Sequence, residues 1–199
     1  MLKLWLIRHG KTKGNKLGRY IGVTDEPLCE EGKEFLKKMN YPVTGNIYVS
    51  PMKRCLETAQ ILFPGKSFLI IDELSECNFG DFENKNYKEL SGNSDYQTWV
   101  DSGCELPIPN GESREEFKRR SLTGFQKAVS GCIRNNVTEA ALVIHGGTIM
   151  NIMEAYADRG RPFYEWHVKN GGGYEVEIDT DLWKRDKREV ILLSSVLEG

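Results

Sequence analysis

The sequence predicts an α/β fold in which one sheet carries helices on both faces. Short apolar runs of strand length alternate along the 199 residues with longer stretches of helical pattern. The first run, Leu2 to Ile7, has bulky residues throughout, as strands do when both faces of their sheet are covered. These two observations indicate a sheet that lies between layers of helices.

Six runs are predicted to be strands. They span residues 2–7, 46–50, 67–71, 140–144, 174–178 and 189–196. The fifth follows three glycines, Gly171 to Gly173, and this triplet is predicted to make a tight turn into the strand rather than a phosphate loop.

Four stretches between these runs are predicted to be helices. They span residues 30–39, 52–62, 112–133 and 148–157. Ser50 as N-cap and Pro51 at the first helical position would start the second of them. The third is the longest, and its apolar residues Phe117, Phe125, Val129 and Ile133 are spaced to bury one stripe.

The chain is predicted to form a single domain over residues 1–199, a size that one core can stabilise. Residues 84–110 are polar and aromatic and are interrupted by glycine and proline. We expect this segment to be a cap inserted over a pocket rather than a part of the sheet.

Composition excludes several classes of partner and compartment. The formal net charge is −2, so neither nucleic acid nor an anionic membrane is expected as the main partner. The five cysteines are odd in number and contain no Cys-x-x-Cys pair, which favours reduced thiols over disulfides or a zinc site. The apolar N-terminal run is too short for a signal peptide or a membrane span, so we expect a cytoplasmic protein.

Three predicted strands run into polar residues that could carry chemistry. His9 and His145 each follow an apolar strand and precede glycine, and Glu76 lies in the loop after the third strand. Arg54 falls in the first turn of the helix after the second strand. Because ligands of open α/β sheets bind beyond the carboxyl ends of the strands, these residues are predicted to meet at one edge.

Their side chains suit phosphoryl transfer. An imidazole can attack phosphorus when one ring nitrogen is free and the other is held by a hydrogen bond. Arg8 and Arg54 can bind phosphate oxygens with two hydrogen bonds each. Glu76 is the candidate acid that protonates the leaving oxygen, and the chemistry alone leaves Glu73 and Glu83 open as alternatives.

Four motifs in order along the chain resemble those of the histidine phosphatase superfamily, the phosphoglycerate mutase-like proteins. Residues 8–15, RHGKTKGN, resemble the R-H-G-x-T-x-x-N signature. Residues 50–59 are similar to S-x-x-x-R-x-x-x-T-A, residues 74–83 to L-x-E-x-x-F-G-x-x-E, and residues 143–147 to the segment around the second histidine.

The resemblance implies a fold, a mechanism and a set of site residues. The implied fold is a three-layer α/β/α sandwich around a mainly parallel sheet. His9 would become phosphohistidine, Arg8, Arg54 and His145 would complete the phosphate pocket, and Glu76 would be the acid. Three further residues, Asn15, Gly22 and Gly146, would contact the substrate. No metal or organic cofactor is expected. The implied partner is a small phosphomonoester, and a homodimer stays open.

The segment after Glu83 favours a phosphatase over a mutase. It reads Asn84 to Tyr87 and lacks the E-R-H-Y element of the cofactor-dependent phosphoglycerate mutases. The start of the chain and residues 79–83, 96–99 and 109–113 are similar to alpha-ribazole-5'-phosphate phosphatases of cobalamin biosynthesis. The alternatives are a broad-specificity sugar or nucleotide phosphatase, a phosphoglycerate mutase, or a binding module without activity.

Several residues outside the predicted catalytic set could bind the substrate or be structural. Tyr20, Tyr87, Tyr96 and Trp99 could stack on an aromatic base or simply pack. His167 lies outside every motif, and we interpret it as structural. Lys11 and the Cys77-Asn78 pair depart from the family pattern without removing a catalytic group.

Overall fold

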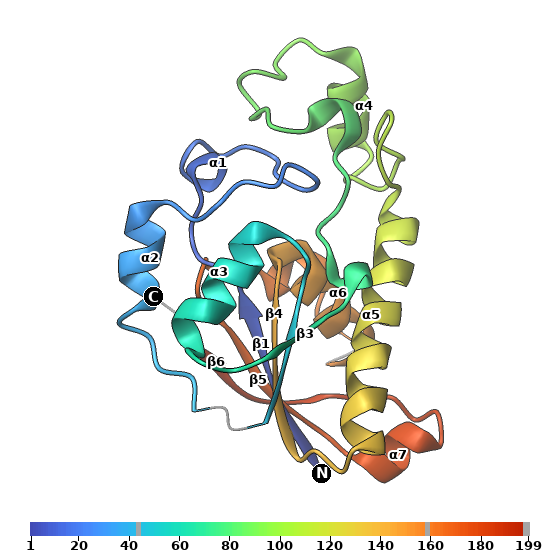
Figure 1. Cartoon of the computed structure of the whole chain (residues 1–199). Helices are drawn as coiled ribbons and strands as arrows, with labels where there is room; N and C mark the ends of the chain where they lie inside the picture. Colours follow the sequence, from blue (N-terminus) through green and yellow to red (C-terminus); the bar gives the residue numbers. More distant parts are fainter. Residues whose placement is uncertain (43–44, 158–159, 197–199) are drawn as a thin grey trace.

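The computed structural model describes residues 1–42, 45–157 and 160–196, and its centre is a six-stranded sheet (Figure 1). The strands are β1 (Leu2–Arg8), β2 (Asn46–Val49), β3 (Phe68–Ile70), β4 (Glu139–Ile144), β5 (Gly173–Ile178) and β6 (Ile191–Val196). Their order is β3-β2-β4-β1-β5-β6, and only β5 runs against the others. The predicted α/β fold with a mainly parallel sheet is confirmed.

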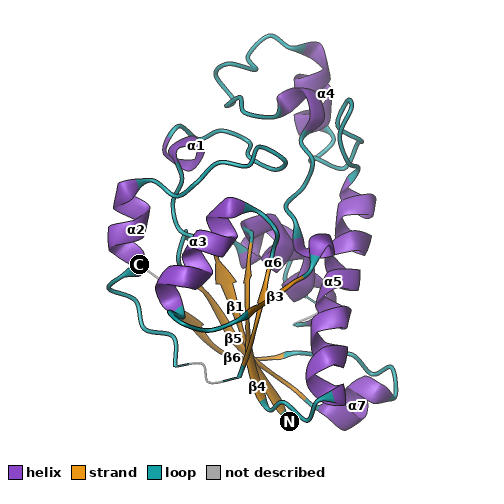
Figure 2. Cartoon of the chain, viewed as in Figure 1, coloured by secondary structure: helices purple, strands orange, loops and turns teal. Residues whose placement is uncertain are grey.

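Helices cover both faces of this sheet (Figure 2). They are α1 (Lys13–Lys16), α2 (Glu30–Leu36), α3 (Lys53–Leu62), α4 (Ser94–Asp101), α5 (Arg114–Arg134), α6 (Gly146–Tyr156) and α7 (Thr180–Lys184). Short 3-10 helices span residues 72–74, 80–82 and 163–166. None of the helices in the described part of the chain is long and apolar enough to cross a membrane.

The period of the strand explains why residues 4–7 of β1 are all apolar. Successive side chains of a strand point to opposite faces. Leu4 and Leu6 pack in the cluster with α5 and α6, whereas Trp5 and Ile7 pack in the cluster with α3. Both faces of β1 are therefore buried between helix layers, as a three-layer sandwich requires.

The predicted start of α3 is wrong. The helix begins at Lys53, and its N-cap is Met52, which makes no side-chain capping bond. Ser50 still belongs to the strand end, since its N–H donates to the Val143 carbonyl. Its hydroxyl lies 2.7 Å from Nε2 of His145, so a contact with a distant residue takes the place of the local cap.

Other helix ends differ by a few residues from those predicted. Ser113 caps α5 in a capping box with Glu116, so α5 begins at Arg114 rather than at residue 112. The helix α6 begins at Gly146 rather than at residue 148, and α2 ends at Leu36 rather than at residue 39. In α5 the predicted stripe is buried except for Ile133, which is only partly buried.

Residues 84–110, with α4, lie beyond the carboxyl edge of the sheet, at the top of Figure 1. They have an apolar cluster that is separate from those of the sheet and includes Leu90, Trp99 and Ile108. The Tyr20 and Tyr96 hydroxyls are 2.9 Å apart, and Tyr20 and Tyr96 both pack against Trp99. These three rings pack on one another, whereas Tyr87 is exposed. That the segment acts as a cap remains a prediction.

Candidate active site

The register of β1 and β4 brings the two predicted histidines together. The strands are parallel neighbours, and Arg8 lies opposite Ile144. His9 follows Arg8 and His145 follows Ile144, so the two histidines lie side by side at the carboxyl edge of the sheet. Their ring centroids are 5.2 Å apart. Both residues are buried, which makes their protonation sensitive to the charges around them.

His9 has the protonation pattern of a nucleophile. Its Nδ1 lies 2.7 Å from the carbonyl oxygen of Gly10 and donates to it, which leaves the lone pair on Nε2. Burial, together with the positive charges of Arg54 and Arg8, holds the pKa of His9 well below its usual value. The neutral ring with a free Nε2 is therefore the stable form.

Arg54 is fully buried and is held by backbone carbonyls. Its Nη1 donates to Thr24 O at 2.9 Å, its Nη2 to Gly22 O at 2.8 Å, and its Nε to Nδ1 of His145 at 3.3 Å. The last contact requires Nδ1 of His145 to be the acceptor, so Nε2 carries the proton towards Ser50. Burial and Arg54 both lower the pKa of His145, and its ring is neutral as well.

Arg8 is the second cation at this edge. Its Nη1 donates to Val168 O at 2.6 Å and lies 3.3 Å from Nε2 of His167. Its Nε is buried and has no hydrogen-bond partner among the described residues. A Cβ at Gly146 would lie 3.2 Å from this Nε, so the glycine keeps room beside an unused donor.

Glu76 is the carboxyl that reaches the same edge. Its Oε1 accepts from the Cys77 N–H and its Oε2 from the Gly147 N–H, both at 3.0 Å. Burial raises the pKa of the Glu76 carboxyl, against the opposing effect of these donors and of the two arginines. The side chains of the two alternatives have other partners: Glu73 pairs with Lys127, and Glu83 accepts from the N–H groups of residues 22 and 24.

Asn15 and Gly22 are both held by hydrogen bonds within the chain, and their contacts with a substrate stay predictions. Asn15 is in α1, and its Oδ1 accepts from the Thr12 N–H at 3.2 Å. The Gly22 N–H donates to the Glu83 carboxylate at 2.7 Å. The carbonyl of Gly22 holds Arg54 in place.

The positive charge at this edge belongs to side chains. In the described ranges, no group of three or more histidine, cysteine, aspartate or glutamate residues is arranged to hold a metal ion. Arg8 and Arg54 are the cations whose charge lowers the pKa of both histidines. The arrangement can accept a dianionic group between two guanidinium groups and a neutral imidazole.

Residues 4–189 match the family model of the histidine phosphatase superfamily (branch 1). The chain belongs to the histidine phosphatase superfamily. It is 28% identical over 192 residues to "Putative phosphoserine phosphatase 2" of Hydrogenobacter thermophilus, an alignment that covers 90% of this chain and 91% of that protein. It is 30% identical over 127 residues to an adenosylcobalamin/alpha-ribazole phosphatase of Salmonella typhimurium, covering 60% and 63% of the two chains. The names of these relatives support a phosphatase.

Solved structures confirm the predicted phosphoglycerate mutase-like fold. The alpha-ribazole phosphatase from Shigella flexneri superposes with a TM-score of 0.81 at 26% identity, over 100% of this chain and 96% of that one. A phosphoglycerate mutase from Thermus thermophilus superposes with a TM-score of 0.73 at 25% identity, over 100% of both chains.

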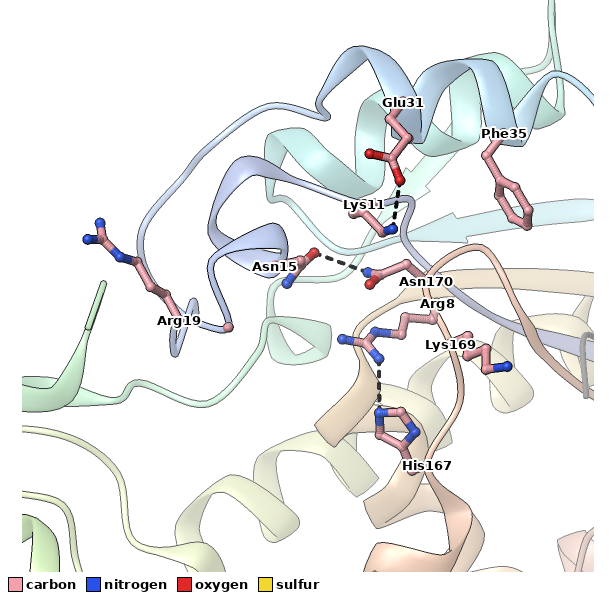
Figure 3. A pocket seen from close by; sticks show the side chains of 11 residues that line it. Arg8, Lys11, Asn15, Arg19, Glu31, Phe35, His167, Lys169 and Asn170 are labelled. Atoms are coloured by element: carbon pink, nitrogen blue, oxygen red, sulfur yellow. Dashed lines mark hydrogen bonds and ion pairs between the residues drawn. The ribbon is translucent and has the colours of Figure 1, made fainter. Parts of the chain in front are cut away.

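Two cavities of this histidine phosphatase meet at Arg8 and His167. The smaller, of about 330 Å³, contains Glu76 and has aromatic walls. These walls are formed by Tyr20, Phe79, Trp99, Phe117, Phe163 and Tyr164. The larger, of about 730 Å³, lies between α1, α2 and residues 167–170 and is lined by charged and amide side chains (Figure 3).

His167 is the residue that the sequence interpretation missed. The sequence alone indicates a structural role, yet His167 lines both cavities and contacts the Arg8 guanidinium. No motif contains it, and 159 residues separate it from Arg8 in the chain. Only folding brings the two together, so the sequence contains no local signal for this contact.

Gly22→Ala is expected to destabilise the phosphatase strongly. A Cβ at this position would lie 1.7 Å from the Cys77 carbonyl oxygen, so the backbone must move. We expect a loss of about 3 kcal/mol or more, and hence a fall in the thermal midpoint of roughly 5–10 °C, measured by circular dichroism. Gly92→Ala is the control, because its Cβ meets nothing within 4 Å. Its free energy of unfolding should fall by only about 1–2 kcal/mol, the cost of placing a residue other than glycine in the left-handed region. A smaller shift for Gly22→Ala than for Gly92→Ala would contradict the close contact.

Proposed function

We propose that the chain is a metal-independent phosphomonoesterase that works through phosphohistidine on His9. The observation that carries the proposal is the neutral, buried His9 ring, with Nε2 free, beside the positive charges of the buried Arg54 and the partly buried Arg8. Nε2 attacks phosphorus, the bond to the leaving oxygen breaks, and the protonated Glu76 gives its proton to that oxygen. Glu76 then takes a proton from water as the water attacks phosphohistidine. Inorganic phosphate leaves and His9 is restored.

The arginines have separate roles in this mechanism. The buried Arg54 is held by backbone carbonyls and provides fixed positive charge where the equatorial oxygens become more negative. Arg8 has an unused Nε donor beside Gly146 and can bind a phosphate oxygen directly. His145 shares a hydrogen bond with Arg54 and holds one side of the pocket.

Trapping of the intermediate tests this mechanism. The purified chain is mixed with ³²P-labelled phosphomonoester in the presence of EDTA and quenched in alkali. We expect a labelled protein whose phosphate is stable in base, is lost in acid and maps to His9. Phosphate release without any labelled histidine would overturn the mechanism. Abolition of turnover by EDTA would overturn its metal independence.

The proposed substrate is an alpha-ribazole-5'-phosphate-like ester with an aromatic base. The cavity that contains Glu76 has aromatic walls and would receive the leaving group. Flat bases stack on such walls. The named Salmonella and Shigella phosphatases support the same class. This would assign the chain to cobalamin biosynthesis in the cytoplasm.

Phosphoserine is the second candidate, because the Hydrogenobacter relative covers nearly the whole chain. A carboxylate on the leaving group would need a free cation in the cavity. Arg114 lines the cavity but forms ion pairs with Glu105 and Glu154, which favours the aromatic leaving group. Comparison of kcat/KM for alpha-ribazole phosphate, phosphoserine, sugar phosphates and nucleotides decides between them. Phosphoglycerate isomerisation with bisphosphoglycerate tests the mutase alternative.

Tyr164→Ala is expected to raise KM for alpha-ribazole phosphate by on the order of tenfold, the usual loss for one aromatic stacking contact. Tyr164 is 58% exposed, so its removal should not unfold the chain. KM for a small alkyl phosphate should change little, because that leaving group does not reach the ring. Tyr87→Ala is the matched control, since Tyr87 is 63% exposed and lies outside the lining of the cavity. Equal effects of Tyr164→Ala on both substrates would refute a stacking role.

A further inference from the structure

The segment 167–171 holds the strand end that carries His9. Asn170 Nδ2 donates to the His9 carbonyl oxygen at 3.2 Å and to Oδ1 of Asn15 at 3.1 Å. The Gly171 N–H lies 3.1 Å from the carbonyl oxygens of Arg8 and His9. Figure 3 shows Asn15, Asn170 and Arg8 together, with the Asn15 oxygen facing Asn170.

The hydrogen bonds around Asn15 determine which way its amide points. The Thr12 N–H is a donor, so the Asn15 atom that it contacts must be Oδ1. Asn170 contacts the same Oδ1, as well as the His9 carbonyl, and must therefore present its NH₂ group to both. If either amide were reversed, two acceptors or two donors would face each other. The network thus allows one orientation of the pair.

This orientation leaves the Asn15 NH₂ group as a donor without a partner. Oδ1 is engaged by both Thr12 and Asn170, whereas Nδ2 makes no hydrogen bond within the described residues. Asn15 lines the cavity at the Arg8 guanidinium, where an anion would be bound. A phosphate oxygen accepts hydrogen bonds only, so the amide is useful there in this orientation alone.

We propose that Asn170 is a positioning residue that locks the Asn15 amide with its NH₂ group towards the phosphoryl group. The inference rests on the proposed phosphatase function, because it assigns Asn15 Nδ2 to the phosphate. Asn170 itself does not touch the substrate. Without it, Oδ1 keeps only the Thr12 N–H, and the amide can rotate and present an acceptor to an anion.

A double-mutant cycle tests this inference. Asn170→Ala and Asn15→Ala are made singly and together, and kcat/KM and the orthovanadate dissociation constant are measured. With Asn15 present, we expect Asn170→Ala to lower kcat/KM and to raise the orthovanadate dissociation constant, each by about tenfold or more, the lower end of the value of one hydrogen bond to a charged group. In the Asn15→Ala background, Asn170→Ala should change kcat/KM and the orthovanadate dissociation constant by less than about twofold.

Two further variants complete the design. Asn135→Ala removes the amide of an exposed asparagine at the end of α5, whose Nδ2 donates to Gly131 O, and should change neither quantity. If Asn170→Ala fails to fold by circular dichroism, Asn170→Leu replaces it with a neutral side chain of similar shape. Equal losses in both backgrounds, whichever variant is used, would overturn the inference, because Asn170 would then act without Asn15.

Vanadate binding by calorimetry separates this inference from the proposed function. It requires no turnover. A wild-type chain that releases phosphate from no phosphomonoester would refute the proposed function, while the vanadate cycle would still decide the role of Asn170. A fully active chain whose cycle is additive would refute the inference alone.

Discussion

His9→Ala is expected to lower kcat at least about 1,000-fold on every phosphomonoester that the wild-type chain hydrolyses. The variant keeps the two guanidinium groups and Glu76 but lacks the atom that bonds to phosphorus. A nearby neutral His145 cannot replace it, because Nδ1 accepts from Arg54 and Nε2 lies 2.7 Å from Ser50. Steady-state phosphate release and ³²P trapping measure the loss, and no labelled protein should form.

His167→Ala is the comparison for this prediction. The chain has three histidines, and His167 is the exposed one, which lines the two cavities and contacts the Arg8 guanidinium. Its removal should cost far less than removal of His9, and the phosphoenzyme should still form. If the two variants lost activity equally, or if His9→Ala kept wild-type turnover, His9 would not be the nucleophile.

The sequence predicts that His9 and His145 lie close together, because this follows from where two parallel strands end. Apolar strands end at His9 and His145, and parallel neighbours carry such residues to one edge. The motif resemblance favours Glu76 as the acid, but the chemistry of the sequence alone does not separate it from Glu73 and Glu83, and the fold does. Glu76 lines the aromatic cavity together with Arg8, and burial raises the pKa of its carboxyl, and neither property has a signature within the loop itself.

Long-range hydrogen bonds account for the parts that the sequence could not predict. Ser50 has the sequence of an N-cap, but its hydroxyl contacts His145, 95 residues away, and helix α3 begins later. The Gly22 N–H donates to Glu83, 61 residues away, and nothing in the sequence around either residue indicates this hydrogen bond. Such partners come together only through the tertiary fold. Secondary-structure propensity and the spacing of residues along the chain therefore do not indicate them.

Glu76→Gln is expected to lower kcat/KM for an alkyl phosphate by about 100- to 1,000-fold, the usual value of a general acid. The same change should cost far less on p-nitrophenyl phosphate, whose leaving group departs without a proton. This comparison is needed because both carboxylate oxygens accept backbone N–H groups, and a glutamine must lose one of these bonds. A structural disturbance would slow both substrates alike, whereas loss of the acid slows only the alkyl ester.

Glu73→Gln is the matched control, since Glu73 lies in the same loop and pairs with Lys127 at the surface of α5. It should keep wild-type kcat/KM on both substrates. A loss as large as that of Glu76→Gln would reassign the acid to Glu73.

The pH profile gives the second measurement on Glu76. Burial raises the pKa of Glu76, so its protonated form persists to higher pH than that of an exposed glutamate. Activity that needs this proton falls as pH rises through that pKa. The pKa of His9 is lowered, so the nucleophile stays neutral until pH falls below the usual range of histidine. The wild type should therefore lose kcat/KM at both ends, and Glu76→Gln should lose the decline at high pH. The ionisation of the substrate contributes equally to both profiles, so a high-pH decline that is the same in the variant and in the wild type would show that Glu76 is not its source.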